Sequence, residues 1–270
     1  MNRLFITGDI HGEAIERFSY KKHPEFRELD EQDVILIVGD CGLPFGVNLP
    51  SYDSKYKQKD KYELDWLSKR KETYLFLCGN HDDRSAIGEM PYVDKFNGQL
   101  RQVIFDGITY DNIFYIDFPQ ILDICGQHCL CIPGAKSHDI DVILDPEADN
   151  FEERYATLAH NPFTFFRIRD WTWWDNEDIN IEETEYLVTH HAGERYDCIF
   201  THDCPSIFLE KYDIGVGRVK PTAGEELLDM IRRTQIYDCW IHGHQHFDVI
   251  NYVGNVTCLY KNIVEITEGE

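Results

Sequence analysis

Short apolar runs that end in small polar clusters recur along this chain of 270 residues. Runs of this kind are typical of buried strands, and a glycine directly after a run permits a tight turn with positive φ. The runs are Leu4–Thr7, Val34–Val38, Tyr74–Cys78, Cys198–Thr201 and Cys239–Ile241. The pattern therefore predicts five buried strands, each of which leads directly into a polar turn.

Helical patterns separate these strands. Tyr62–Lys71, Ile181–His191 and Thr222–Arg233 place apolar residues at helical spacing among charged ones. Strands that alternate with helices indicate βαβ units and a largely parallel sheet. Gln102–Pro133 and Val249–Ile266 instead carry short apolar runs separated by turn residues, which predicts antiparallel hairpins. We therefore expect an α/β protein in which two sheets pack face to face with helices outside.

Composition and length favour a globular domain. The chain is 43% hydrophobic and 13% aromatic, and a chain of this length can bury a large core as one domain. We expect a single domain over residues 1–270 with an irregular insertion around residues 136–180. No apolar segment approaches the roughly 18 residues of a membrane span, and the amino terminus turns polar too soon for a signal peptide. We therefore expect a cytoplasmic protein.

The charge balance restricts the partners. The chain has 26 Lys and Arg against 49 Asp and Glu, which leaves a formal net charge of −23. Nucleic acids and anionic membranes are bound by clustered cations, so this balance argues against both as partners. It favours small substrates over long polyanions and indicates no oligomeric state.

The nine cysteines lie mostly in apolar runs, which predicts reduced, buried thiols. Cys125, Cys129 and Cys131, with His128 between them, form an alternative set of zinc ligands. The paired C-x-x-C spacing of structural zinc is missing there, so we expect these residues to pack in strands.

The polar clusters hold the candidate chemistry. Parallel strands end at a common edge of the sheet, where ligand sites assemble. The side chains that these clusters bring to that edge are Asp9, His11, Asp40, Asn80, His81, His202, His244 and His246. Carboxylate and amide oxygens together with imidazole nitrogens suit Mn, Fe or Zn. About seven ligands exceed the four that one tetrahedral ion needs, so we expect two metal ions.

The order and spacing of these residues resemble the motifs of the calcineurin-like metallophosphoesterases, and in particular a bacterial and phage branch of that superfamily. The matching segments are Gly8–Gly12 for GDxHG, Gly39-Asp40 for GD, Gly79–Asp82 for GNHD, the later single His202, and Gly243–His246 for GHxH. The resemblance implies a four-layer α-β-β-α sandwich of two mixed sheets and a dinuclear metal site.

The resemblance also implies a role for each residue. One ion would be held by Asp9, His11 and His246, the other by Asn80, His202 and His244, with Asp40 as the bridge. A hydroxide that bridges the two ions would attack phosphorus in line. His81 would be the catalytic acid that protonates the departing oxygen.

The chain departs from the protein Ser/Thr phosphatases of this superfamily. After Asp40-Cys41-Gly42, this chain has Leu43 and Pro44 where those phosphatases have a further Asp and an Arg. The carboxylate that would orient His81 is therefore missing from its usual place, and Asp82, Asp83 or an acid from another loop are the alternatives. Arg84 is a candidate for holding the phosphate group.

These observations predict a metal-dependent hydrolase of small phosphomonoesters or phosphodiesters. A non-catalytic scaffold that binds protein partners and a protein Ser/Thr phosphatase are the alternatives, and a nuclease conflicts with the acidic chain. The aromatic residues of the segment 163–174 could stack on a nucleobase, but we expect them to form a hydrophobic flap.

Overall fold

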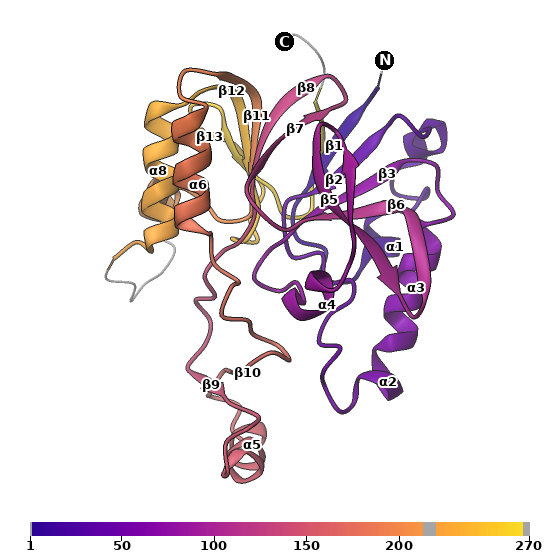
Figure 1. Cartoon of the computed structure of the whole chain (residues 1–270), viewed down its shortest axis with the longest axis vertical. Helices are drawn as coiled ribbons and strands as arrows, with labels where there is room; N and C mark the ends of the chain where they lie inside the picture. Colours follow the sequence, from indigo (N-terminus) through magenta and orange to yellow (C-terminus); the bar gives the residue numbers. More distant parts are fainter. Residues whose placement is uncertain (1, 213–219, 267–270) are drawn as a thin grey trace.

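The computed structural model describes residues 2–212 and 220–266, and within them two sheets form the centre of the molecule (Figure 1). The first sheet, in spatial order, contains β15 (Ile263–Ile266), β1 (Leu4–Thr7), β2 (Val34–Ile37), β3 (Thr73–Leu77), β6 (Ile108–Ile116), β5 (Gly98–Phe105) and β4 (Tyr92–Lys95). The second contains β13 (Val249–Val253), β14 (Val256–Cys258), β12 (Ile236–His242), β11 (Arg195–Thr201), β8 (Gln127–Ile132) and β7 (Gln120–Ile124).

Both sheets are parallel at the centre and antiparallel at the edges. β1, β2, β3 and β6 pair in parallel, as do β8, β11, β12 and β14. The central strands are buried on both faces, which explains their continuous apolar sequences. β15, β5 and β4 in the first sheet, and β7 and β13 in the second, pair antiparallel. The prediction of two mixed sheets is therefore confirmed.

The predicted hairpins of the middle segment are present but are divided between the sheets. β5 pairs with β6 in the first sheet and β7 pairs with β8 in the second. The chain crosses from one sheet to the other between Ile116 and Gln120. The hydrophobic pattern of a single strand does not indicate which of the two sheets the strand joins, so the sequence does not predict this crossing.

Helices cover the two outer faces, while the inner faces share one core. Ile6 and Leu75 of the first sheet pack in the same buried cluster as Phe200 and Cys131 of the second. The outer face of the first sheet is covered by α1 (Ala14–Phe18) and α3 (Lys57–Leu67). The outer face of the second is covered by α6 (Ile181–His190), α7 (Ser206–Tyr212) and α8 (Ala223–Thr234). The molecule is thus the four-layer α-β-β-α sandwich that the sequence predicts.

Local capping fixes the ends of the best-predicted helices. Thr222 accepts from the backbone of Glu225, whose carboxylate accepts from the backbone of Thr222, so α8 begins with a capping box. Asn180 caps α6 in a similar way through the backbone of Glu183. The remaining elements are short: a 3-10 helix over Pro24–Glu28, α2 (Tyr52–Lys55), α4 (Arg84–Gly88), α5 (Phe151–Ala159), β9 (Val142–Leu144) and β10 (Phe166–Ile168).

The segment between β8 and α6 leaves the sandwich, and its β9, β10 and α5 project away from the sheets (Figure 1). Its aromatic residues mostly serve packing. Trp174 is buried and donates from its indole nitrogen to Ser85 Oγ at 2.8 Å, and Trp171 packs edge-on against Phe151. Phe163, between α5 and β10, is 89% exposed. The single-domain organisation over residues 1–270 stays a prediction.

All nine cysteines are free thiols. Cys129 and Cys131 pack in the core between the sheets, as expected, and Cys125 lies near the backbone carbonyl of Arg3. Across residues 2–212 and 220–266, the side-chain groups that could share a metal ion do not include this trio. Over the same residues, no helix has the length and apolar character to cross a membrane.

Candidate metal centre

All eight predicted site residues lie on loops that follow strand ends. Asp9 and His11 follow β1, Asp40 follows β2, and Asn80 and His81 follow β3 in the first sheet. His202 follows β11, and His244 and His246 follow β12 in the second sheet. The loops of the two sheets therefore meet at one end of the sandwich, because the parallel strands of both sheets finish there.

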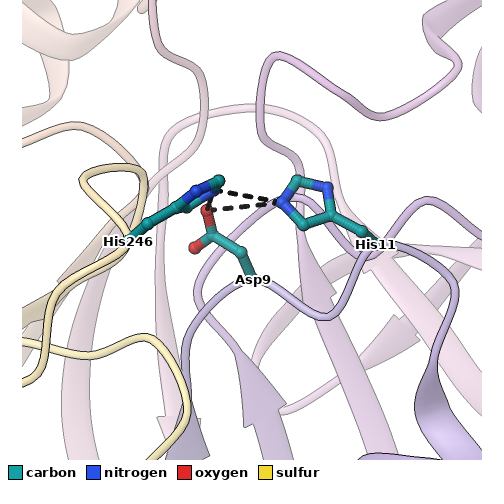
Figure 2. A group of neighbouring side chains, drawn as sticks. All are labelled: Asp9, His11 and His246. Atoms are coloured by element: carbon teal, nitrogen blue, oxygen red, sulfur yellow. Dashed lines mark hydrogen bonds and ion pairs between the residues drawn. The ribbon is translucent and has the colours of Figure 1, made fainter.

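Asp9, His11 and His246 form the first group (Figure 2). Asp9 Oδ2 lies 3.1 Å from His246 Nε2 and 4.0 Å from His11 Nε2, and the two imidazole nitrogens are 3.1 Å apart. Asp9 is almost fully buried, and its Oδ2 faces the two imidazole nitrogens. Three potential ligand atoms thus converge on one point.

Asp40, His202 and His244 form the second group, which is buried throughout. His202 Nε2 lies 3.2 Å from Asp40 Oδ1 and 3.1 Å from Asn80 Oδ1. His244 Nε2 is buried without a hydrogen-bond partner in the described part of the chain. The amide of Asn80 therefore joins this group through its oxygen.

Neighbouring groups fix the direction of these ligand atoms. His202 Nδ1 lies 2.9 Å from the backbone carbonyl of Val38, which places the proton on Nδ1 and leaves the Nε2 lone pair facing the cluster. Asn80 donates from Nδ2 to Ser137 Oγ at 3.0 Å, and this contact turns its oxygen toward His202. Asp9 Oδ1 accepts from the backbone N–H of His244 at 3.0 Å, so a bond between the two sheets holds that carboxylate.

The backbone of the site is strained, and its glycines explain how the loops approach. His11, Asp40, His244 and His246 all have positive φ, between 46° and 65°, which is uncommon for residues other than glycine. A Cβ at Gly79 would lie 2.1 Å from Asp40 Oδ1. The Gly-Asp and Gly-Asn-His motifs therefore need their glycines for close packing.

Burial and the charges of neighbouring groups have opposite effects on the pKa values of these residues. Burial opposes protonation of His202, but the charge of Asp40 and the hydrogen bond to it outweigh burial and raise the pKa of His202 to about 10. Burial favours a neutral Asp40, but the charges of His202 and His81 hold the pKa of Asp40 well below its usual range. Burial lowers the pKa of His244. The carboxylate of Asp40 thus attracts positive charge to Nε2 of His202, where either a proton or a metal ion can supply it.

His81 lies at the edge of the cluster. Its backbone N–H donates to Asp40 Oδ1 at 2.7 Å, and its ring is 5.6 Å from that of His11 and 6.2 Å from that of Phe45. The carboxylate of Asp82 accepts instead from the backbone N–H groups of Gly42 and Gly79, each at 2.7 Å.

Asp83 and Arg84 also point away from the centre. Asp83 caps α4 by accepting from Ala86, and accepts from the backbone of Val47 as well. Both carboxylates thus bind backbone N–H groups, and an acid from another loop is the remaining alternative for orienting His81. Arg84 donates to the carbonyl oxygens of Asp117 and Glu177 and lines a different cavity, so it does not hold a phosphate group at this centre.

Several residues that contact the site are not predicted by the sequence patterns. Ser137 contacts Asn80, and the ring of His138 lies 5.0 Å from that of His244. Tyr260 stacks on His246 at 4.6 Å. These residues lie in or just after the two segments predicted as hairpins, where no motif marks them.

The chain was compared with known proteins. It shares 14% identity with a phosphopantetheinyl hydrolase from Mycobacterium tuberculosis, over 96% of this chain and 88% of that one, with a TM-score of 0.40. It shares 12% identity with a candidate 5′-nucleotidase from Staphylococcus aureus, over 97% of this chain and 50% of that one, with a TM-score of 0.48. Both similarities are too low to indicate a function, and no curated protein matches.

The family comparison is decisive. The family model of the calcineurin-like phosphoesterases matches residues 3–248, which include all eight site residues. The match covers most of the chain and both sheets of the sandwich. The chain belongs to the calcineurin-like phosphoesterases.

Proposed function

We propose that this metal-dependent phosphoesterase hydrolyses small phosphomonoesters or phosphodiesters at a centre of two metal ions drawn from Mn, Fe and Zn. The observation that supports this most directly is that carboxylate and imidazole atoms converge in two groups, and that one of these atoms, the buried His244 Nε2, lacks a hydrogen-bond partner among the described residues. Such an atom costs about 1–3 kcal/mol, and a cation bound there would remove the cost. The mixed oxygen and nitrogen donors fit these ions.

The proposed ligands divide into two sets that share one carboxylate. One ion would be held by Asp9, His11 and His246, the other by Asn80, His202 and His244, and Asp40 would touch both. Ions bound in this way would activate water and neutralise charge on the phosphate oxygens. The backbone contacts of His202 and Asp9 hold their ligand atoms in place beforehand.

His81 would give a proton to the departing ester oxygen. Its backbone is anchored on Asp40, while its ring faces His11 and Phe45 at the open side of the cluster. Over the described residues no group hydrogen-bonds that ring, so it can turn toward a leaving oxygen. In the reaction the bond between phosphorus and the organic oxygen breaks, water supplies the oxygen added to phosphorus, and the alcohol leaves with the proton.

The alternatives fit these observations less well. A non-catalytic scaffold has no need of the acid, yet His81 and every proposed ligand are present. A protein Ser/Thr phosphatase of this superfamily would carry a further Asp and an Arg after Asp40, and Arg84 does not substitute for that Arg. Small esters are therefore the favoured substrates.

The test is metal content and phosphate release after loading with Mn, Fe or Zn. We expect two ions per chain and turnover of small phosphate esters. His81→Gln should keep both ions and lose turnover, most strongly for alkyl esters, whose leaving groups need a proton most. His190→Gln, an exposed histidine on α6, is the matched control. A fully loaded protein that hydrolyses no ester would favour the scaffold, and loss of metal in His81→Gln would make His81 a ligand.

A further inference from the structure

A cavity of about 220 Å³ opens beside the proposed metal centre. Its inner side is formed by His11 and His81, and two aromatic residues, Phe45 and Tyr56, stand in its wall. Lys59, Asp60 and two glycines complete the lining. The cavity therefore adjoins the side of the cluster on which the proposed acid lies.

Two of the residues that line the cavity are glycines, Gly12 and Gly42. Gly12 donates to the carbonyl of Cys41 at 2.7 Å, which joins the loop after β1 to the loop after β2. Gly12 and Gly42 both have positive φ, and a Cβ at Gly12 would lie 3.2 Å from the carbonyl oxygen of Gly42. Because neither position carries a side chain, neither fills the cavity that it lines.

The aromatic wall is held in place before any ligand binds. The backbone N–H of Phe45 and the hydroxyl of Tyr52 both donate to Asp60 Oδ2, at 3.3 Å and 2.6 Å. The ring of Phe45 packs edge-on against buried Trp174 at 5.8 Å. Asp60 is thereby occupied within the wall, and the half-buried Phe45 presents a fixed ring surface to the cavity.

We propose that this cavity binds the organic leaving group of the ester and selects substrates in which that group is a planar ring system of one or two rings. The inference rests on the proposed function, because the oxygen that His81 protonates must lie near its ring. The group attached to that oxygen then extends away from the metal ligands and into the adjoining cavity. The volume is below the range of drug-sized ligand pockets and admits a ring rather than a peptide or a nucleic acid. Phe45 and Tyr56 would contact the ring by stacking or edge-on packing.

The test compares benzyl phosphate with ethyl phosphate on the metal-loaded protein. Both esters release an alcohol of similar acidity, so the ratio of their kcat/KM values reports ring binding rather than leaving-group chemistry. We expect the wild type to prefer benzyl phosphate, and Phe45→Ala and Tyr56→Ala each to lower that ratio by about tenfold. Phe45→Leu keeps apolar volume without the ring and should also lower the ratio. Because it is a ratio, a general loss of activity in a variant cancels.

Tyr62→Ala is the control, since Tyr62 lies on α3, is 66% exposed and does not line the cavity. The ratio of its kcat/KM values for benzyl phosphate and ethyl phosphate should equal that of the wild type. A ratio that is the same in the wild type and in all Phe45 and Tyr56 variants, with both esters hydrolysed, would overturn the leaving-group site and leave the proposed function intact. Failure of the loaded wild type to hydrolyse either ester would instead overturn the proposed function.

Discussion

Glu177 is a buried acid that supports the metal centre from outside it. Its Oε1 accepts from the backbone N–H of Ser137 at 2.8 Å, and Ser137 Oγ in turn accepts from Asn80. Its Oε2 is buried as well, and Glu177 is only 4% exposed. Glu177→Gln keeps the shape and the acceptor for Ser137 but removes the ionisation.

The expected change in the free energy of unfolding follows from the pKa of Glu177. Burial raises the pKa of Glu177 from 4.5 to about 7. Below pH 4.5 the carboxyl is protonated in both the folded and the unfolded chain, and as the pH rises toward 7 the unfolded chain loses its proton first. The folded state is therefore destabilised as the pH rises. At about 1.4 kcal/mol for each unit of pKa, the wild type should lose about 3 kcal/mol between pH 4 and pH 8 relative to Glu177→Gln.

The assay is urea unfolding of both proteins across that pH range in the same metal buffer. The difference between their free energies of unfolding is compared at each pH, because other titrating groups contribute equally to both. Glu182→Gln removes an exposed acid at the start of α6 and controls for the general loss of charge. Wild-type and Glu177→Gln curves that stay parallel across the range would refute the reasoning, since they would mean that Glu177 titrates alike in both states.

Two further predictions concern the motif carboxylates. Asp82→Asn should lower the free energy of unfolding in urea by about 2–4 kcal/mol, because the amide NH₂ would face one of the N–H groups of Gly42 and Gly79 inside the core. An effect below about 1 kcal/mol would show that these contacts matter little. Asp40→Asn should reduce the occupancy of both ions, as counted by elemental analysis, because it weakens the shared ligand. Retention of two ions per chain would show that another group bridges them.

The meeting of these side chains at one end of the sandwich could be predicted because the information is local. A buried strand followed by a metal-competent residue and glycine is visible in a few residues, and parallel strands bring such ends together without any knowledge of register. Asp82 shows the limit of that reasoning. It is adjacent to His81 in sequence, but its side chain turns into the core toward Gly42 and Gly79 and away from the histidine.

The residues that surround the site could not be predicted, because their contacts with it are not local in the sequence. Ser137 and Glu177 come from a segment with no periodic pattern, 57 and 97 positions after Asn80. Phe45 and Tyr56 belong to a loop and a short helical turn whose packing depends on Asp60. Contacts of this kind arise from tertiary packing alone, so neither hydrophobic alternation nor motif spacing indicates them.

The position of the centre between the sheets has a mechanical consequence. Each proposed ion would draw ligands from both halves of the sandwich: Asp9 and His11 against His246 for one, Asn80 against His202 and His244 for the other. Metal would then act as a pair of cross-links across the seam, and binding to the folded chain alone would raise its stability with metal concentration. Chelation would weaken the seam itself, so amide protons of β1 and β12 should exchange together when the metal is withdrawn.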